Sequence, residues 1–346
     1  MHLNNSTKNQ PVMSIQDVAR DSGVSVATVS RVFNLPDKVT TATRERVEGV
    51  ARALGYFPNA SARTLRTQKS RVLGVMLPSL LNPVFAECLE GIARAATVAG
   101  YAIAPITTDY RLDLEERAAS QLLAGGVAGV ILVVSNPSTS VALQKLAAAG
   151  VPYTLAYNRH PSHPCVSVDS QTAVRELVGK LVRLGHQRLR MVSGQLAASD
   201  RAQQRWRGFI QGMQIAGLPQ GDVLEVPFVE AAVAQIETVL RGAQRPTALV
   251  CSNDLLAIRS IRAAHLAGLT VPHDLSVVGF DGIALGEDLT PMLSTISQPN
   301  TEIGRCSVDM LVASLAGDTP LTPACSLTLA HFFREGESCA PPGAGT

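Results

Sequence analysis

The sequence predicts a small all-α helix-turn-helix module followed by a larger α/β core of two lobes with parallel sheets. Three observations lead to this prediction. Residues 15–34 have the spacing of two short helices joined by a tight turn. From Val72 onward, strand-like apolar runs alternate with helical stretches. Two of these runs end in a similar polar sequence, at residues 135–136 and 252–254, as expected of two related lobes.

The first element is the stretch of residues 15–34. It has a small residue, Ala19, where two helices would cross, and Gly23 is free to take a positive φ in the turn. The branched Val29 would seat the second helix against the first. This spacing is typical of a helix-turn-helix, whose second helix is short enough to enter a DNA major groove. The rest of the chain is then expected to control DNA binding.

A third helix is expected within residues 40–56, because apolar residues recur at helical spacing from Val47 to Leu54 and Gly55 is a natural stop. The segment Pro58–Thr67 that follows is polar and basic, with Leu65 as its one large apolar residue. Isolated helices shorter than ~12–15 residues are marginal in water. We therefore expect this segment to form a helix only when something docks against it.

The remainder predicts parallel sheets covered by helices on both faces, since strand-like runs recur every 20–35 residues with helical stretches between most of them. The chain is too long for one such unit, so two similar lobes with a cleft between them are expected. A ligand would then lie at the carboxyl ends of strands that face the cleft. The expected strands are 72–77, 102–106, 127–134, 151–155, 189–192, 248–251 and 275–280.

Charge is distributed unevenly along the chain, although the formal net charge is only +2. Residues 1–70 carry ten Lys and Arg against five Asp and Glu, whereas the other 276 residues carry twenty against twenty-three. A basic module joined to a mildly acidic body is expected when only one end of a protein meets phosphates.

Several classes of protein are disfavoured. The six cysteines form no C-x-x-C pair, residues 1–12 lack the apolar stretch of a secretory signal, and no window approaches the ~20 apolar residues of a membrane span. A soluble cytoplasmic protein is therefore expected. Without a nucleophile elbow, a phosphate-binding loop or a dinucleotide fingerprint, we expect no enzyme, cofactor or metal site. A transport-associated sugar-binding protein would share the two-lobed core, but it would need an export signal and no DNA-binding module.

These residues strongly resemble the lactose-repressor/galactose-repressor (LacI/GalR) family of bacterial transcription regulators. The resemblance extends from about residue 14 to residue 333. The helix-turn-helix motif is highly specific, and the motifs of the lobes are individually weak but follow the family's order. The matching motifs are Ile15-x-Asp17-Val18-Ala19, Gly23-Val24-Ser25-x-x-Thr28-Val29-Ser30-Arg31-Val32-x-Asn34, Leu54-Gly55-Tyr56-x-Pro58-Asn59-x-x-Ala62-Arg63-x-Leu65, Leu184-Gly185-His186, Arg205-x-x-Gly208-Phe209, Asn253-Asp254, Ser276–Asp281 and Gln298-Pro299.

The resemblance implies a repressor that binds a near-palindromic operator as a homodimer in the bacterial cytoplasm, associated with the nucleoid. A periplasmic-binding-protein-like core would sense a small metabolite and switch DNA binding, by induction or by corepression. The C-terminal tail carries no leucine heptad, which favours a dimer over a tetramer. The expected division is a disordered segment 1–13, a headpiece 14–57, a hinge 58–70, a core 71–335 and a flexible tail 336–346. Within the core, the N-lobe takes about 71–168 plus 299–325, and the C-lobe takes 169–298 plus 326–335.

At the DNA end, Arg31 is suited to a bidentate contact with guanine, worth ~1–3 kcal/mol of discrimination; alternatively it is a solvated helix residue. Val26 and Ala27 could read only thymine methyl groups or groove shape. The family's hinge implies that Leu65 wedges into the minor groove and bends the DNA; alternatively it is a packing residue. The expected DNA-binding residues are Ser25, Val26, Ala27, Thr28, Ser30, Arg31, Asn34, Asn59, Ala62 and Leu65.

At the ligand end, carboxylates and amides would bind hydroxyl groups, and aromatic faces would contact C–H surfaces. Asp281 is the sharpest candidate, with a loop-anchoring role as its alternative, and Asp254 is expected to cap a helix. Many family members have an aspartate where this chain has Asn158, and Arg201 is a second cation nearby, unless it lies on the surface. These two features tilt the expected ligand toward a sugar acid or sugar phosphate. The expected effector-binding residues are Asn82, Phe85, Asn158, Arg159, Arg205, Phe228, Asn253, Asp281 and Gln298.

Overall fold

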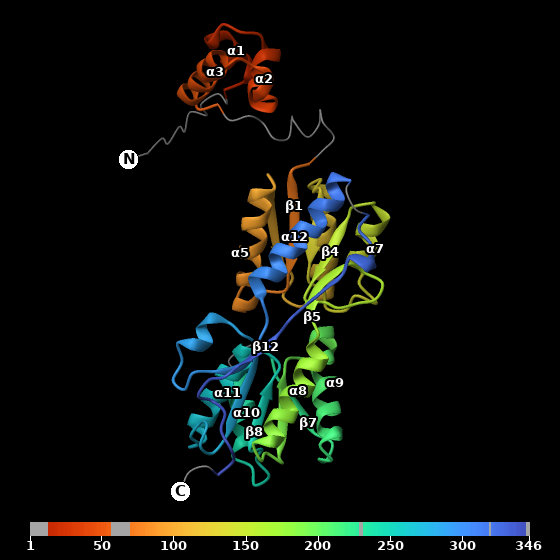
Figure 1. Cartoon of the computed structure of the whole chain (residues 1–346), viewed down its shortest axis with the longest axis vertical. Helices are drawn as coiled ribbons and strands as arrows, with labels where there is room; N and C mark the ends of the chain where they lie inside the picture. Colours follow the sequence, from red (N-terminus) through yellow and green to blue (C-terminus); the bar gives the residue numbers. More distant parts are fainter. Residues whose placement is uncertain (1–12, 57–69, 228–230, 318–319, 344–346) are drawn as a thin grey trace, which may run out of the picture. The chain divides into compact units, whose positions relative to one another are not determined.

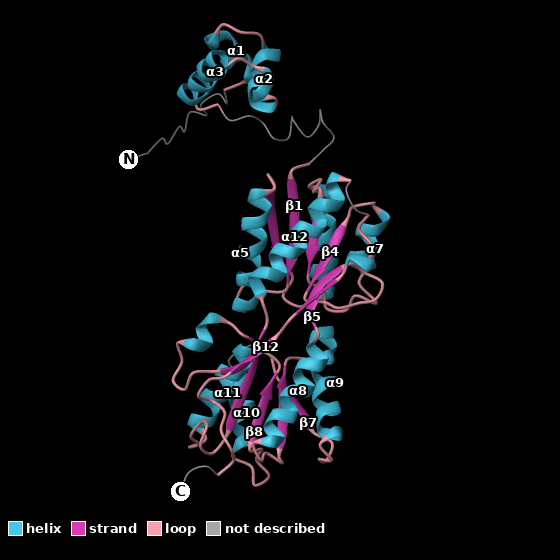
Figure 2. Ribbon diagram, viewed as in Figure 1, coloured by secondary structure: helices cyan, strands magenta, loops and turns pink. Residues whose placement is uncertain are grey.

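The computed structural model describes residues 13–56, 70–227, 231–317 and 320–343. The chain divides into two compact units, Met1–Lys69 and Ser70–Thr346. Figure 1 follows the chain through both units, and Figure 2 distinguishes helices from strands. Asn59, Ala62, Leu65 and Phe228 lie outside the described residues, as do residues 1–12.

The first unit contains three α-helices, α1 (Ile15–Ser22), α2 (Val26–Asn34) and α3 (Thr41–Leu54), with a 3-10 turn η1 (Pro36–Lys38) before α3. Ser14 starts α1 with a reciprocal capping box to Asp17, and Gly23 ends it in the left-handed conformation at φ 67°. The expected helix-turn-helix is therefore present. Its small core consists of Val18, Ala19, Val29, Val32, Val47 and Ala51.

The second unit contains two α/β lobes, as predicted. The N-lobe elements are β1 (Val72–Leu77), α5 (Pro83–Val98), β2 (Ala102–Thr107), α6 (Leu112–Ala124), β3 (Gly129–Leu132), α7 (Val141–Ala148), β4 (Tyr153–Ala156), β5 (Cys165–Val168), α12 (Asn300–Ala316), η4 (Pro323–Cys325) and β11 (Leu327–Leu329). The C-lobe elements are α8 (Ser170–Arg183), β6 (Leu189–Ser193), η2 (Leu196–Ala198), α9 (Asp200–Ile215), β7 (Asp222–Glu225), α10 (Ala231–Leu240), β8 (Ala248–Cys251), α11 (Asp254–Leu266), β9 (Ser276–Asp281), η3 (Ala284–Glu287), β10 (Ser294–Ser297) and β12 (Phe332–Arg334).

Each lobe is built on a six-stranded sheet, in the order β11-β5-β4-β3-β1-β2 in the N-lobe and β12-β10-β9-β8-β6-β7 in the C-lobe. The pairings are parallel except for the antiparallel β10–β12 pair. The chain therefore passes between the lobes three times, after β5, after β10 and after β11 (Figure 1). The expected third boundary at residue 326 was wrong, because Leu327–Leu329 pair with β5 of the N-lobe.

Helices cover both faces of each sheet (Figure 2). In the N-lobe, alternate residues of β1 point to opposite faces: Leu73 and Val75 contribute to the core under α5 and α12, and Met76 to the core under α6 and α7. The C-lobe has the same two-core arrangement, with α8 and α9 on one face and α10 and α11 on the other. Burial of both faces explains why the central strands are continuous apolar runs.

Helices α8 and α9 cross closely at Gly208. A Cβ atom at this position would lie 2.2 Å from the carbonyl oxygen of Gln171, which is closer than any real contact, so only glycine fits. The buried stripe of α9 continues to Phe209 and Met213. This crossing fixes the rotation of α9 and thereby the direction in which Arg205, three residues earlier, projects.

The C-terminal segment is attached to the C-lobe, which corrects the expected flexible tail from residue 336. Ser338 is fully buried, and its hydroxyl donates to the Val277 carbonyl (2.6 Å) and accepts from the Ser294 amide (2.9 Å). A ring nitrogen of His186 lies 2.9 Å from the Ala340 carbonyl oxygen. Tail residues up to Ala340 therefore complete the polar pairing of the lobe.

Candidate functional site

Helix α2 displays a short face that is available to a partner. Ser25 caps the helix and accepts from the Thr28 amide (3.1 Å). Val26, Ala27 and Arg31 are exposed, whereas Val29 and Val32 are buried in the headpiece core. Among the described residues no carboxylate pairs with Arg31, so its guanidinium is open to a base edge.

The other predicted DNA contacts on this helix and at its N-cap have partners within the same segment. The Asn34 side-chain amide donates to the Ser30 carbonyl (2.6 Å), and the Ser25 and Thr28 hydroxyls lie 2.9 Å apart. These contacts leave Val26, Ala27 and Arg31 as the side chains most accessible to a groove. Their exposure and the fold of the module agree with the prediction, and their base contacts stay predictions.

The second unit contains a cavity between the two lobes, with a volume of about 350 Å³. The lining residues next to strands lie at the carboxyl ends of those strands, as expected for an α/β ligand site. Six of the nine predicted effector residues line it: Asn82, Phe85, Arg205, Asn253, Asp281 and Gln298. The prediction did not include the other lining residues, which are Val84, Asp109, Tyr110, Arg111, Tyr157, Gly194, Gln195, Ala198, Ser199, Arg201, Ala202, Val226, Pro227 and Ser252.

Arg205 and Asp281 form the polar centre of the C-lobe wall. Nη2 of Arg205 lies 3.2 Å from Oδ1 of Asp281, and the Gln298 amide donates to the same oxygen (2.9 Å). The Arg205 guanidinium also lies over the Phe280 ring, 3.6 Å from its centroid, and donates to the Ser252 carbonyl. Burial raises the pKa of Asp281 to about 6, although the neighbouring arginines oppose this shift.

Backbone strain is concentrated in the cavity wall. Among the described residues, four that are not glycine have positive φ: Asp109 (48°), Tyr110 (58°), Tyr157 (63°) and Asp281 (120°). All four line the cavity. Such conformations cost of order 1–3 kcal/mol each and cluster at functional sites. Side-chain patterns carry no signal of backbone dihedrals, which is one reason why the sequence did not reveal the two tyrosines.

Aromatic side chains form the N-lobe wall. Phe85 makes edge contacts with Tyr157 and Tyr110, at centroid distances of 5.7 and 6.4 Å. Burial raises the pKa of Tyr110 to about 12 and that of Tyr157 well above its usual value, so both hydroxyls stay protonated. The wall therefore combines apolar faces with neutral hydroxyl groups.

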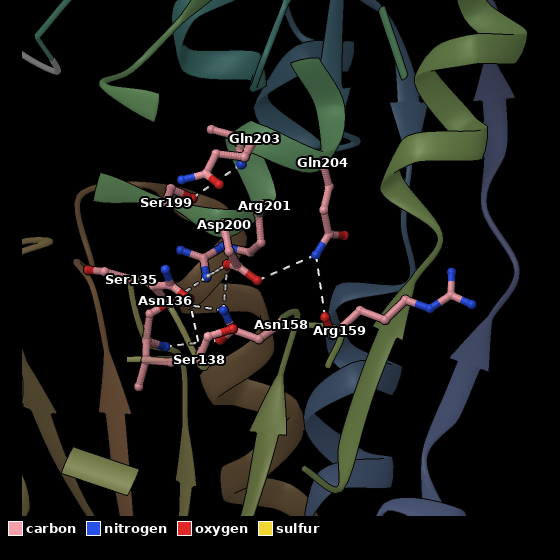
Figure 3. Close-up of polar contacts among 12 residues, drawn as sticks. Ser135, Asn136, Ser138, Asn158, Arg159, Ser199, Asp200, Arg201, Gln203 and Gln204 are labelled. Carbon is pink, nitrogen blue, oxygen red and sulfur yellow. Dashed lines mark hydrogen bonds and ion pairs between the residues drawn. The ribbon is translucent and has the colours of Figure 1, made fainter. Parts of the chain in front are cut away.

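Asn158 and Arg159 do not line the cavity, which corrects their prediction as effector ligands. Asn158 is fully buried, and its amide accepts from the Val134 N–H (3.0 Å) and donates to the Val134 carbonyl (2.9 Å) and to Oδ1 of Asp200 (2.6 Å). Arg159 forms a surface ion pair with Asp169 at 2.6 Å. Figure 3 shows its side chain extending away from Asp200 and Arg201. The amide at position 158 is therefore occupied by protein groups.

The contacts around Asp200 join the lobes and are called the interlobe bridge: Val134, Ser135 and Asn158 on the N-lobe side, and Asp200 and Arg201 at the start of α9. The Asp200 amide donates to the Ser135 carbonyl (2.8 Å), and Nη1 of Arg201 donates to the Val134 carbonyl (2.8 Å) and lies 3.1 Å from Oδ1 of Asp200 (Figure 3). Burial raises the pKa of Asp200. Arg201 thus belongs both to the bridge and to the cavity wall.

The predicted capping role of Asp254 was wrong. Asn253 is the cap of α11 and accepts from the Leu256 amide (2.9 Å). Asp254 instead accepts from the Ile283 amide (2.9 Å) and the Thr295 hydroxyl (2.6 Å), so it fastens α11 to the segments around β9 and β10. The sequence offered no means to separate these two adjacent residues.

No group of His, Cys, Asp or Glu that could hold a metal ion occurs in the described part of the chain. None of the helices in the described ranges is long and apolar enough to cross a membrane.

A helix-turn-helix unit joined to a two-lobed α/β unit with an interlobe cavity defines the class of ligand-responsive DNA-binding proteins. Comparison with family models identifies the family within this class. Residues 14–59 match the bacterial regulatory proteins of the lacI family, and residues 70–331 match the periplasmic binding proteins and sugar binding domain of the LacI family. The chain belongs to the LacI family of bacterial transcription regulators.

Individual relatives are similar in sequence to nearly the whole length of this chain. The chain is 32% identical over 312 residues to catabolite control protein A of Priestia megaterium, covering 89% of this chain and 94% of the relative. It is 31% identical over 316 residues to the transcriptional repressor CytR of Escherichia coli, with 90% and 92% covered. Its structure is similar to that of the lac repressor dimer bound to operator and the anti-inducer ONPF, with a TM-score of 0.84, 27% identity and 95% and 99% of the two chains covered.

Proposed function

We propose that the protein is a repressor that binds a near-palindromic operator as a homodimer and is switched by a small polar metabolite in the interlobe cavity. The observation that carries this proposal is the cavity itself, which takes its walls from both lobes, at strand ends, in the same chain as an exposed α2 face. A ligand that contacts both walls favours one relative position of the lobes over another. The operator-bound and ligand-bound lac repressor dimer, similar over almost the whole chain, supports this reading.

The test begins with operator selection by the full-length protein from random duplex DNA, followed by footprinting. A protected near-palindrome is expected, with its two half-sites one helical turn or a multiple of it apart. A panel of sugars, sugar acids and sugar phosphates is then screened for compounds that change operator affinity. Failure to select any preferred sequence, or protection of a single half-site only, would contradict the proposed dimeric repressor.

The hinge is part of the same proposal, supported by the sequence pattern and the family resemblance. We predict that Leu65→Ala lowers operator affinity and DNA bending together, because the leucine would wedge between base steps of the minor groove. Gel-shift assays with circularly permuted DNA measure both quantities. Val26→Ala, on the α2 face, is the matched control: it should weaken affinity without changing the bend angle. Retention of both affinity and bending by Leu65→Ala would refute the wedge.

A further inference from the structure

Two arginines one turn apart on α9 face the cavity. Arg201 and Arg205 are 5% and 7% exposed, and both line the cavity wall. Residues four apart lie on one face of a helix. They occupy the cavity end of the same buried stripe that continues through Gly208 toward Phe209. The fold therefore directs two guanidinium groups, rather than apolar side chains, at the ligand space.

Each of these guanidinium groups retains a buried nitrogen without a partner. Among the described residues, Nη2 of Arg201 and Nε of Arg205 have no hydrogen-bond acceptor. Leaving a donor of a charged group unsatisfied in a protein interior is costly. The carboxylates beside them are already engaged: Asp281 with Arg205 and Gln298, and Asp200 with Arg201 and Asn158. The remaining donors match an acceptor that the protein itself does not supply.

The carboxylates around the wall limit the charge that a ligand can carry. Arg111, Arg201 and Arg205 line the cavity together with two carboxylates, Asp109 and Asp281. Asp113 and Asp200, which pair with Arg111 and Arg201, add negative charge close to the wall. A phosphate ester carries −1.5 to −2 charges near neutral pH and would face the two carboxylates with more repulsion than a carboxylate would.

Three helices also begin at the cavity. Asn82, Ser199 and Asn253 are the N-caps of α5, α9 and α11, and all three line the wall. Each N-terminus carries about half a positive elementary charge, which stabilises anions nearby. The amides of Asn82 and Asn253 are suited to hydroxyl groups, and Phe85 offers an apolar face to C–H surfaces.

We propose that the effector is a small polyhydroxylated carboxylic acid whose carboxylate is bound by Arg201 and Arg205. This assignment of ligand class rests on the proposed role of the cavity as the effector site. Nη2 of Arg201 and Nε of Arg205 donate to the carboxylate oxygens, and the hydroxyl groups contact the cap asparagines. The volume of about 350 Å³ is at the small end of the usual range for ligand sites, which suits a molecule of monosaccharide size.

The test compares acids with matched neutral compounds by calorimetry on the full-length protein. The pairs are D-glucuronate with D-glucose, D-galacturonate with D-galactose, and D-gluconate with D-glucitol, and D-glucose 6-phosphate is included. At least one acid should bind ten times or more tighter than its neutral partner. If no acid binds, if the neutral partners bind equally well, or if the phosphate ester is preferred, the proposal is overturned.

Variants of α9 test whether Arg201 causes the preference for an acid over a neutral compound. Arg201→Gln should weaken binding of the preferred acid at least tenfold more than binding of its neutral partner, and Arg201→Lys should recover part of the loss. Arg207→Gln removes an exposed arginine of α9 and should leave both affinities unchanged. Equal losses in Arg201→Gln and Arg207→Gln would overturn the assignment. The comparison of ligands on the unmodified protein stays decisive if Arg201→Gln does not fold.

Operator binding separates this inference from the proposed function. If a neutral sugar binds and changes operator affinity, the repressor function stands and the carboxylate proposal fails. If an acid binds as described but leaves operator affinity unchanged, the ligand class stands and the role of the cavity as a switch fails.

Discussion

At the scale of single residues, buried charge is concentrated at the C-lobe end of the cavity. Burial raises the pKa of Asp254 to about 7 and that of Asp281 to about 6. The negative charge of Asp281 adds to the shift at Asp254. Both carboxylates hold defined hydrogen bonds, to Ile283 and Thr295 in one case and to Arg205 and Gln298 in the other. Both residues keep the strand ends in place, and Asp281 also lines the cavity.

Asp254 predicts a pH dependence of stability. Its folded-state pKa lies above the ordinary aspartate value of 3.8, so between pH 4 and 7 the folded protein binds more protons than the unfolded chain. Stability therefore falls as pH rises through this window. Asp254→Asn, which can keep both hydrogen bonds, should make the free energy of unfolding less dependent on pH between 5 and 7, as measured by urea denaturation. Asp288→Asn, at an exposed position, is the control, and an unchanged slope in Asp254→Asn would contradict the prediction.

At the scale of secondary-structure elements, the close crossing of α8 and α9 determines where the cavity arginines point. The contact at Gly208 leaves no room for a side chain because backbone of α8 lies against it. The spacing Arg205-x-x-Gly208-Phe209 thus has a physical reason: Arg205 lines the cavity, Gly208 allows the close approach of α8, and Phe209 fills the core. The headpiece needs a glycine for a different reason at Gly23, whose positive φ permits the turn before α2.

A pair of glycine substitutions tests this crossing. Gly208→Ala should lower the free energy of unfolding by about 1–3 kcal/mol, because the added methyl group forces the helices apart. It should also weaken effector binding through the displacement of Arg205. Gly179→Ala, on α8, meets only the end of the flexible Arg183 side chain and should be neutral or up to about 1 kcal/mol stabilising. Thermal and chemical denaturation with calorimetry give both readouts, and equal effects of the two substitutions would exclude the crossing as the cause.

At the scale of the whole second unit, hydrogen bonds outside the three crossings also join the lobes. One group is the interlobe bridge around Asp200 (Figure 3). Another contact is made by Glu87 of α5, which accepts from the Ala284 amide of the C-lobe (3.1 Å). Since Arg201 lies in the bridge and in the cavity wall, a ligand that binds Arg201 contacts the group that holds the lobes together. We therefore expect occupation of the cavity to act on the relative position of the lobes.

The interlobe bridge leads to a prediction about effector affinity. Asn158→Ala removes the amide between Val134 and Asp200 without changing the cavity wall, so effector affinity should fall several-fold because one arrangement of the lobes loses support. The dependence of operator binding on effector concentration should shift in parallel. Asn136→Ala removes a nearby amide that bonds only within its own loop, to the Ser138 amide, and serves as control. Identical effector affinity in Asn158→Ala and the unmodified protein would show that the bridge does not couple the lobes to the ligand.

The sequence by itself determined those features that depend on short-range pattern. The headpiece follows from helical spacing, caps and one glycine, because its contacts are local. The apolar central strands were predicted because burial on both faces leaves a continuous apolar run. Five strands were not predicted. β7, β11 and β12 have no buried residue and lack such a run, and the buried β5 and β10 are interrupted by serine and threonine.

Only the tertiary structure decided which polar residues meet the ligand. Asn158 and Arg201 were both noted in the sequence, and folding turned the amide toward protein partners and the arginine toward the cavity. Tyr110 and Tyr157 reach the wall through backbone conformations that no side-chain pattern encodes. The physical reason is that the cavity is assembled from strand ends of two lobes between which the chain crosses three times. Neighbours across such a site are distant in sequence, and their directions are set by packing.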